Sequence, residues 1–211
     1  MTQAKGRQRR AYAARMPVEQ RRQQLLDATL ALIGRDGYAG LTIEAIAAEA
    51  GVTKPVVYGV YANLADLLTA LIDHTQAEAL TQILAAFPAD PGRLNSPQII
   101  AGIARGWAQA VRENPRIWAP VLLAGPQTPT EVLDRIEQGR QVIRGAMTRF
   151  MGGGHEIDAK TAERRGWIAH MVLASAEHFG RMILTDPGVI SDDEIAALFQ
   201  DMITGLLFPP S

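Results

Sequence analysis

TIEAIAAEAGVTKPVVYGVY, residues 42–61, is the stretch that decides the fold of this chain. Thr42 precedes Ile43 and the apolar run 45–48 as a helix N-cap does, and Gly51 suits the left-handed conformation that ends a helix. Thr53 then caps a second helix, with Pro55 in its first turn, where a missing N–H is tolerated. Two short helices joined by a glycine turn predict a helix-turn-helix, a motif with which proteins enter the major groove of DNA.

The second helix of this stretch is short, and its small or apolar residues would enter a groove without steric difficulty. We expect Lys54, Val56, Tyr58 and Gly59 to be exposed and Val57 to face the core. The alternative for Tyr58 is a half-buried ring that packs this helix against the first helix of the chain.

The wider sequence around this motif resembles the N-terminal DNA-binding domain of the TetR family of transcriptional regulators. The resemblance covers roughly residues 20–72, and beyond them only length and helical content agree. The pieces that carry it are Asp36-Gly37-Tyr38, Leu41-Thr42, Ala50-Gly51-Val52, Val57-Tyr58 and Leu67-Leu68. The sequence departs from the family pattern at Leu64, where Lys is usual, and at Val60, where His is usual.

The resemblance implies a set of DNA-binding residues. Thr42 and Tyr58 match positions that hydrogen-bond phosphate, and Lys54, Pro55 and Val56 match positions that face base edges. A Lys can donate to guanine, and the methyl groups of Val can contact thymine. Thr53, as the cap, and Gly59, which leaves room for the backbone to approach DNA, complete the predicted set.

Composition sets the broad class. The chain has 211 residues, 47% of them hydrophobic, and no Cys. That length allows a sizeable core, and no apolar run reaches the length of a membrane span. The basic N-terminus lacks the apolar region of a secretory signal. We therefore expect a cytoplasmic protein with no disulfide, no membrane partner and no cofactor. Because no catalytic triad, acid pair or metal-ligand cluster stands at useful spacing, we also expect no enzyme and no metal site.

Charge is distributed unevenly along the chain. Residues 1–60 hold nine Lys and Arg against five Asp and Glu, whereas the remainder is acidic. A cationic surface is what docking to phosphate requires, although an asymmetry of this size can also arise by chance. We predict a flexible basic arm at 1–16, which either follows DNA or is a solvated tail, a helix-turn-helix domain at 17–62, and a ligand-binding and dimerisation domain at 63–211.

Apolar periodicity and capping signals predict an all-α fold of about nine helices. The predicted starts include Asn63, Ser96-Pro97, Asn114-Pro115, Asp158 and a capping box at Ser191–Glu194. A second capping box is predicted at Thr128-Pro129-Thr130-Glu131. Breaks are expected at 88–95 and at the glycine triplet 152–154.

The last two predicted helices, about 158–184 and 191–206, have more apolar surface than one hairpin needs. We expect them to pair with their copies in a four-helix bundle, which is also the family's dimer mode. The alternative is that they close a monomeric core. A dimer would present two recognition helices to successive major grooves.

The helices between residues 63 and 184 are predicted to enclose a pocket for a small molecule. Aromatic and Met side chains at helical spacing are more often core than pocket, and His170 and His178 stand too far apart to suggest a shared metal. The candidate ligand-binding residues are Arg105, Trp107, Trp118, Met147, Phe150, Trp167, His170, Met171 and His178.

These observations predict a ligand-responsive transcriptional regulator. We expect a repressor that leaves a near-palindromic, double-stranded DNA operator when a small-molecule effector binds the C-terminal domain and moves the helix after residue 63. The alternatives are an activator of the same architecture, a small helical enzyme, and an adaptor with no role on DNA.

Overall fold

The computed structural model describes residues 16–86, 96–151 and 158–207, and within these ranges the chain forms nine helices and no strand. The all-α prediction is therefore confirmed. The basic arm, apart from Met16, and the breaks predicted at 88–95 and 152–154 lie outside the described residues. The helices are α1 (Val18–Asp36), α2 (Ile43–Glu49), α3 (Lys54–Tyr58), α4 (Leu64–Ala86), α5 (Pro97–Glu113), α6 (Pro115–Leu122), α7 (Thr130–Met151), α8 (Ala159–Thr185) and α9 (Asp192–Leu207).

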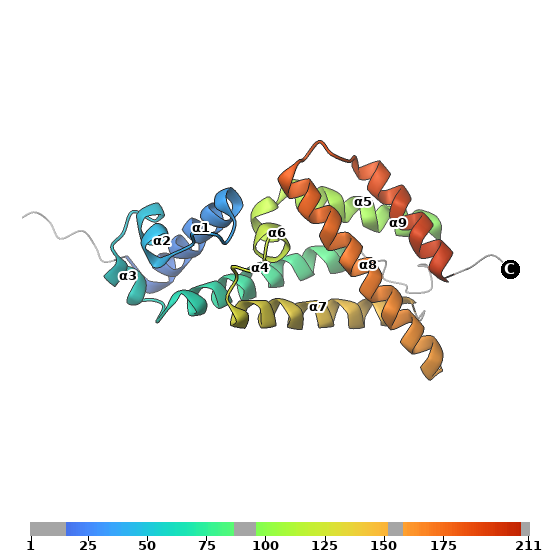
Figure 1. The fold of residues 1–211 in the computed structure, drawn as a ribbon, viewed down its shortest axis with the longest axis horizontal. Helices are drawn as coiled ribbons and strands as arrows, with labels where there is room; N and C mark the ends of the chain where they lie inside the picture. The colour runs from blue at the N-terminus through green and yellow to red at the C-terminus, as the bar shows by residue number, and fades with distance from the viewer. Residues whose placement is uncertain (1–15, 87–95, 152–157, 208–211) are drawn as a thin grey trace, which may run out of the picture.

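The first three helices form one end of an elongated molecule, and α4 runs from them into the other end, with α6 above it and α7 below it in the view of Figure 1. One hydrophobic core joins α1 to α4, and Ala119 of α6 and Val132 and Ile136 of α7 belong to it as well. The first half of α4 thus packs with α1–α3. The predicted domain boundary at residue 62 therefore falls within this core and not between two cores.

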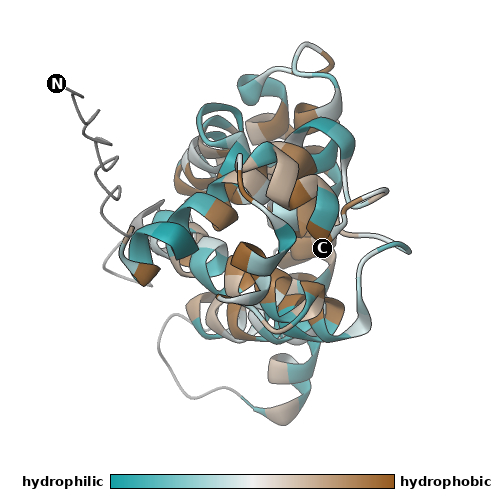
Figure 2. Cartoon of the chain, turned by 90° about the vertical axis from the view of Figure 1, so that its left-hand side faces the viewer, coloured by the Kyte–Doolittle hydropathy of each residue, from teal (hydrophilic) through white to brown (hydrophobic). Residues whose placement is uncertain are grey.

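A second core lies among α5, α6, α8 and α9, and Ala79 of α4 reaches it. Its closest helix pair is α5 with α9, which lie side by side in Figure 1. Seen from the α1–α3 end, the helices carry hydrophilic and hydrophobic positions in turn, as amphipathic helices do (Figure 2). None of the described helices combines the length and the apolarity needed to cross a bilayer.

The predicted cap side chains make hydrogen bonds to the backbone at the starts of α4, α8 and α9. Asn63 Oδ1 accepts from the Asp66 N–H at 2.8 Å, and Asp158 Oδ1 accepts from the Thr161 N–H at 3.0 Å. At α9, the backbone N–H of Ser191 donates to Glu194 Oε2 at 2.9 Å and the Glu194 N–H donates to Ser191 Oγ at 3.2 Å, which is the reciprocal capping box.

Predicted side-chain caps are missing at four helix starts. Ser96 and Asn114 stand at the N-cap positions of α5 and α6 but make no side-chain cap bond. Thr53 precedes α3 but makes no side-chain cap bond, because the N–H of Val56 already donates to the Thr53 carbonyl at 2.9 Å and Pro55 has no N–H. Thr128 does not open α7, which begins at Thr130. Its hydroxyl instead accepts from the Gly125 N–H at 3.0 Å and closes a turn.

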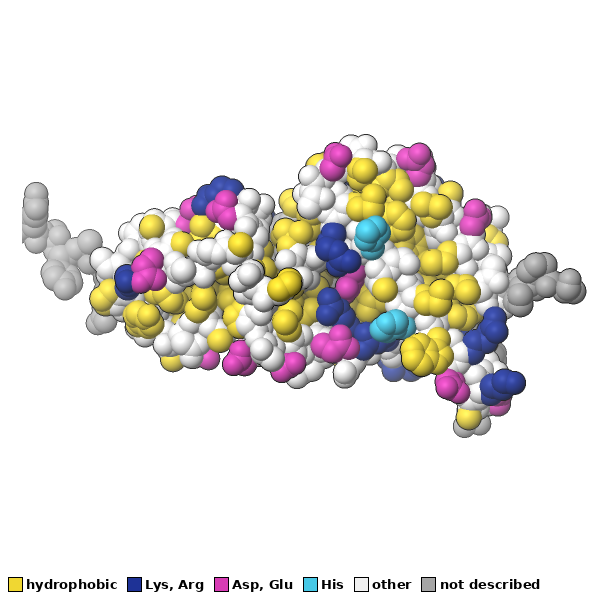
Figure 3. Space-filling model, in the orientation of Figure 1, with side chains coloured by type: hydrophobic (Ala, Val, Ile, Leu, Met, Phe, Trp, Pro, Cys, Tyr) yellow, Lys and Arg dark blue, Asp and Glu magenta, His cyan; other side chains and the backbone are white. Residues whose placement is uncertain are grey.

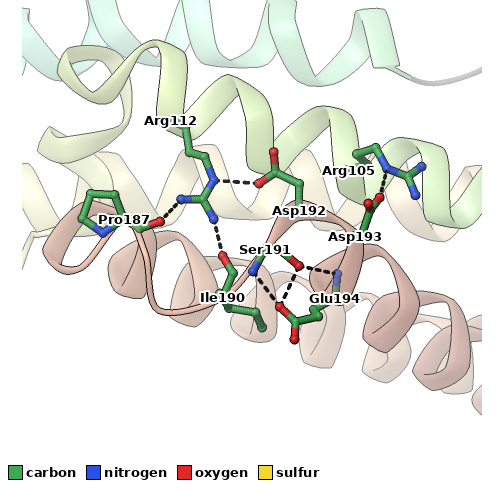
Figure 4. Close-up of polar contacts among 8 residues, drawn as sticks. All are labelled: Arg105, Arg112, Pro187, Ile190, Ser191, Asp192, Asp193 and Glu194. Carbon is green, nitrogen blue, oxygen red and sulfur yellow. Dashed lines mark hydrogen bonds and ion pairs between the residues drawn. The ribbon is translucent and has the colours of Figure 1, made fainter.

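Arginine side chains fasten α5 to the start of α9 (Figure 4). Arg112 Nε donates to Asp192 Oδ1 at 2.7 Å, and its other nitrogens donate to the carbonyls of Pro187 and Ile190. One guanidinium therefore holds both the loop after α8 and the first turn of α9.

Candidate functional site

The turn between α2 and α3 is closed by backbone geometry. Thr42 Oγ1 accepts from the Ala45 N–H at 3.1 Å and caps α2. At the other end of α2, Gly51 has a φ of 64° and donates to the Ala48 carbonyl, while Val52 donates to the Ala47 carbonyl. These two bonds form a Schellman motif, which needs the left-handed residue that Gly51 supplies. The sequence thus fixes the angle at which α3 leaves α2.

Two contacts anchor this pair of helices to the core. Val57 is fully buried, as predicted, and holds α3 from beneath. The side-chain amide of Gln24 in α1 donates to the carbonyl of Ala50 at 2.8 Å. Because Ala50 is the C-cap of α2, this bond satisfies a carbonyl that the helix leaves free.

The outer face of α3 presents the predicted DNA-binding residues to solvent. Tyr58 is 54% exposed, so about half of its surface is open to solvent. Val56 is half-buried. The exposed members of the set are Thr42, Thr53, Lys54, Pro55, Tyr58 and Gly59.

The positively charged group of this face, the Lys54 ammonium, forms an ion pair. Lys54 Nζ contacts Glu44 Oε1 across the two helices. The hydrogen bond between them raises the pKa of Lys54 and lowers the pKa of Glu44. Sequence reasoning did not identify Glu44, because ten residues and a turn separate it from Lys54 and no helical spacing connects them.

An arginine of α1 lies close to this face. The guanidinium of Arg22 lies 5.9 Å from the centre of the Tyr61 ring, within the range of a cation–π contact. Tyr61 itself is buried, as expected of a residue that follows α3. Arg22 therefore has a fixed position beside α3.

An apolar cavity lies among the C-terminal helices. Its volume is about 140 Å³, and residues of α4 to α9 line it. A second, wider cavity of about 450 Å³ opens between α4, α6, α7 and α8, and both share Ile83, Trp107 and Trp118. We call them the inner cavity and the vestibule.

Helix α6 connects the inner cavity to the N-terminal helices. Trp118 of α6 lines the cavity, while two residues further on the carbonyl of Pro120 accepts from the Tyr38 hydroxyl at 2.6 Å. Tyr38 follows α1 and is buried, and this burial raises the pKa of its hydroxyl. A change at the cavity thus has a direct contact path to the helices that hold α3.

Comparison with known proteins agrees with this geometry. The family model described as "Bacterial regulatory proteins, tetR family" matches residues 25–71, which contain the helix-turn-helix. The chain is also 26% identical over 191 residues to a protein of Mycobacterium tuberculosis named an uncharacterized HTH-type transcriptional regulator, covering 90% of this chain and 77% of that protein.

Residues 25–71 of this chain match a TetR-type DNA-binding domain.

The fold of this chain recurs in solved structures. A TetR-like transcriptional regulator from a Rhodococcus species superposes with a TM-score of 0.72 at 20% identity, covering 93% of this chain and all of the other. The fatty acid degradation regulator FadR from Bacillus halodurans superposes with a TM-score of 0.64 at 15% identity, covering 90% of this chain and 95% of that one. The matched helix-turn-helix domain and this fold together support a DNA-binding transcriptional regulator.

The predicted ligand-binding residues of this regulator separate into two groups. Trp107, Trp118, Met147 and Phe150 line the inner cavity. Arg105 does not, because it pairs with Asp193 of α9 at 2.7 Å. The other four do not line either cavity and lie on the exposed face of α8: Trp167, His170, Met171 and His178.

That placement corrects the predicted ligand set. The stripe of α8 that faces inward carries Ile168 and Val172, which are buried in the second core. Trp167 is 64% exposed and Met171 is 48% exposed, so both lie on a side of the helix that neighbours the buried stripe. Among the described residues, no cluster of His, Cys, Asp and Glu could hold a metal ion.

Proposed function

We propose that this regulator is a cytoplasmic repressor that binds a near-palindromic operator as a homodimer and leaves it when a small molecule fills the inner cavity. Residues 17–62 would contact DNA, and residues 63–211 would bind the effector and the partner copy. The observation that carries the proposal is the exposed face of α3, held from beneath by the buried Val57. A short helix so fixed, with Lys54 and Tyr58 outward, suits a major groove.

The exposed face of α8 supports the homodimer. It carries Trp167 and Met171, and Leu198 of α9 is 49% exposed. Figure 3 shows hydrophobic and histidine side chains gathered over α8. Exposed apolar surface of this kind marks interaction sites, and a two-fold axis through it would pair α8 and α9 with their copies.

Release by an effector would follow two contact paths. The inner cavity is lined by Gln82 and Ile83 of α4, whose first half packs with α1–α3. It is also lined by Trp118 of α6, which is connected to Tyr38 through Pro120. A ligand that shifts α4 and α6 would change the separation of the two copies of α3 and spoil their match to successive grooves.

The DNA-binding half is tested by a band-shift assay on duplex DNA from upstream of the protein's own gene. We expect the wild-type chain to bind and Lys54→Met to bind at least about fivefold more weakly, since one base contact contributes about 1–3 kcal/mol. Lys160→Met is the matched control, because Lys160 is exposed on α8, away from α3. Equal DNA affinity of the two variants would refute the proposed role of α3.

Release of DNA by a ligand is tested on the preformed complex of the protein with DNA. Compounds from an unbiased library that bind the protein are added while fluorescence anisotropy follows the labelled DNA. We expect at least one bound compound to lower the DNA affinity. A DNA affinity that stays the same with every bound compound would contradict release by a ligand.

A further inference from the structure

We propose that the effector is a small neutral molecule with an apolar body and one hydroxyl or amide group, held in the inner cavity by Trp118 and Gln82. This inference rests on the proposed function, since it names the class of molecule that the cavity takes. It is carried by the chemistry of the lining and by two polar atoms without partners.

The lining of the inner cavity is almost wholly apolar. Trp107, Phe150 and Phe199 supply aromatic rings, and the remaining members are mostly aliphatic or Met side chains. Among the described residues, no Asp, Glu, Lys, Arg or His lines it. A volume of about 140 Å³ is close to the roughly 150 Å³ of an engineered apolar cavity that accepts benzene. A single ring or a short chain therefore fits.

Two polar atoms of the lining have no hydrogen-bond partner. The indole N–H of Trp118 is buried and unpaired, and so is the side-chain carbonyl oxygen of Gln82. Trp118 as a whole is only 6% exposed. A buried polar atom without a partner is destabilising, and native proteins satisfy nearly all of them. One atom requires an acceptor and the other a donor, and a hydroxyl or an amide offers both.

Among the described residues, the charged side chains that line the vestibule already have partners. In the vestibule, Arg140 Nε donates to Glu177 Oε1 at 2.6 Å, and Arg135 pairs with Asp73. An anionic ligand would have to compete with one of these carboxylates or bury its charge unpaired in the inner cavity. Burying an unpaired charge is strongly unfavourable. The arrangement selects against carboxylates and phosphates and in favour of neutral molecules.

Three probes of nearly equal shape separate these chemistries: 4-ethylphenol, ethylbenzene and 4-ethylbenzoate. Their binding to the full chain is measured by isothermal titration calorimetry at pH 7, without DNA. We expect 4-ethylphenol to bind about fivefold more tightly than ethylbenzene, from the net gain of about one hydrogen bond, and 4-ethylbenzoate to bind most weakly. Tightest binding of the benzoate, equal binding of phenol and ethylbenzene, or no binding of any probe would overturn the inference.

Variants assign the effect to the two side chains. Trp118→Phe and Gln82→Leu should each remove most of the preference for 4-ethylphenol over ethylbenzene. The quantity compared is the ratio of the two dissociation constants, because a change in cavity shape should weaken the binding of both probes alike. The matched control is Gln109→Leu, at an exposed position outside the inner cavity, and it should keep the ratio. An unchanged ratio in both cavity variants would overturn the assignment.

The outcome of this calorimetry is independent of the test of DNA binding. It measures ligand binding alone, so a negative result leaves the band shift with Lys54→Met untouched. Conversely, normal DNA binding by Lys54→Met would refute the role of α3 without changing the calorimetry.

Discussion

At the scale of single residues, Lys54, which we propose contacts DNA, is already engaged in an ion pair within the protein. Its ammonium group is exposed but is paired with Glu44 on the preceding helix. To reach a guanine edge, Lys54 must give up this partner. Glu44 also places a negative charge on the face that approaches phosphate. Both effects oppose binding and limit affinity for DNA that offers Lys54 no good acceptor.

Removing that competitor should strengthen DNA binding. We expect Glu44→Gln to bind the upstream duplex about two- to fivefold more tightly, which is the size of an exposed ion pair. Fluorescence anisotropy at fixed salt measures the change. Glu163→Gln, at an exposed position of α8, should leave the affinity unchanged. Weaker binding by Glu44→Gln would mean that Glu44 positions Lys54 for DNA and does not restrain it.

At the scale of helices, the C-terminal half depends on close contacts between neighbouring elements. Gly180 of α8 lies against α5 and α6, and a methyl group there would come within 2.7 Å of Leu122 Cδ1 and 3.1 Å of Trp107 Cζ2. Polar contacts complement this packing, since Arg112 joins α5 to the α8–α9 loop. Apolar packing and directional bonds thus fix the same group of helices.

Adding a methyl group at Gly180 should destabilise the fold. We expect Gly180→Ala to lower the free energy of unfolding by about 1–3 kcal/mol, because both neighbours are constrained by their own packing. The melting temperature should fall by about 2–4 °C for each kcal/mol. Gly205→Ala in α9, where no atom lies within 4 Å of the added methyl group, should keep or slightly raise the melting temperature. Equal melting temperatures of the two variants would contradict the close approach of α8.

The arginine contacts of α5 should differ in importance. Arg112→Met removes the partner of two loop carbonyls and of Asp192, and we expect a loss of about 1–3 kcal/mol in urea unfolding. The Arg112 side chain is 23% exposed, so solvent screens its contacts only in part. Arg105→Met breaks a more exposed pair with Asp193 and should cost much less. A larger loss for Arg105→Met would refute this ranking.

At the scale of the whole molecule, ion pairs and caps distributed over the helices make stability depend on pH. Hydrogen bonds from Lys54 and Arg144 lower the pKa of Glu44 and Glu137, respectively. At helix starts, bonds from Thr161 and Ser191 lower the pKa of Asp158 and Glu194. Each carboxyl therefore binds its proton less readily in the folded chain than in the unfolded one.

The sign of the pH dependence follows from these four depressed pKa values. Because the unfolded state takes up protons first, their stabilising contribution is complete above the ordinary carboxyl pKa of about 4 and is lost as the pH falls below it. We expect the melting temperature to decline between about pH 5 and pH 3. Replacing Glu194 by Gln, which keeps part of the capping geometry, should reduce that decline slightly. A melting temperature that rises on acidification would contradict the assignment.

Assembly is the other property that belongs to the whole molecule. If the exposed apolar face of α8 is the homodimer surface, Met171→Lys should shift the protein toward monomer in sedimentation equilibrium and weaken operator binding. Val18→Lys, also at an exposed apolar position but on α1, should leave the mass unchanged. A wild-type chain that sediments as a monomer would refute the homodimer.

The sequence by itself determined the helices and the helix-turn-helix. Their signals are local: Gly51 permits the left-handed turn, Asn63, Asp158 and Ser191 supply side-chain caps, and apolar periodicity marks the helices between them. Even here Thr53 and Thr128 were misread, since a backbone bond or a neighbouring turn took the place of the expected cap.

Only the tertiary structure decided which face of a helix is inside. Two neighbouring stripes of α8 are rich in apolar or aromatic residues, and the pattern does not rank them; packing buries Ile168 and leaves Trp167 and Met171 outside. The contacts of Lys54 with Glu44 and of Tyr38 with Pro120 likewise join residues without a sequence spacing that would connect them. Periodicity reports that a helix has an apolar side, whereas the neighbours that cover it come from distant parts of the chain.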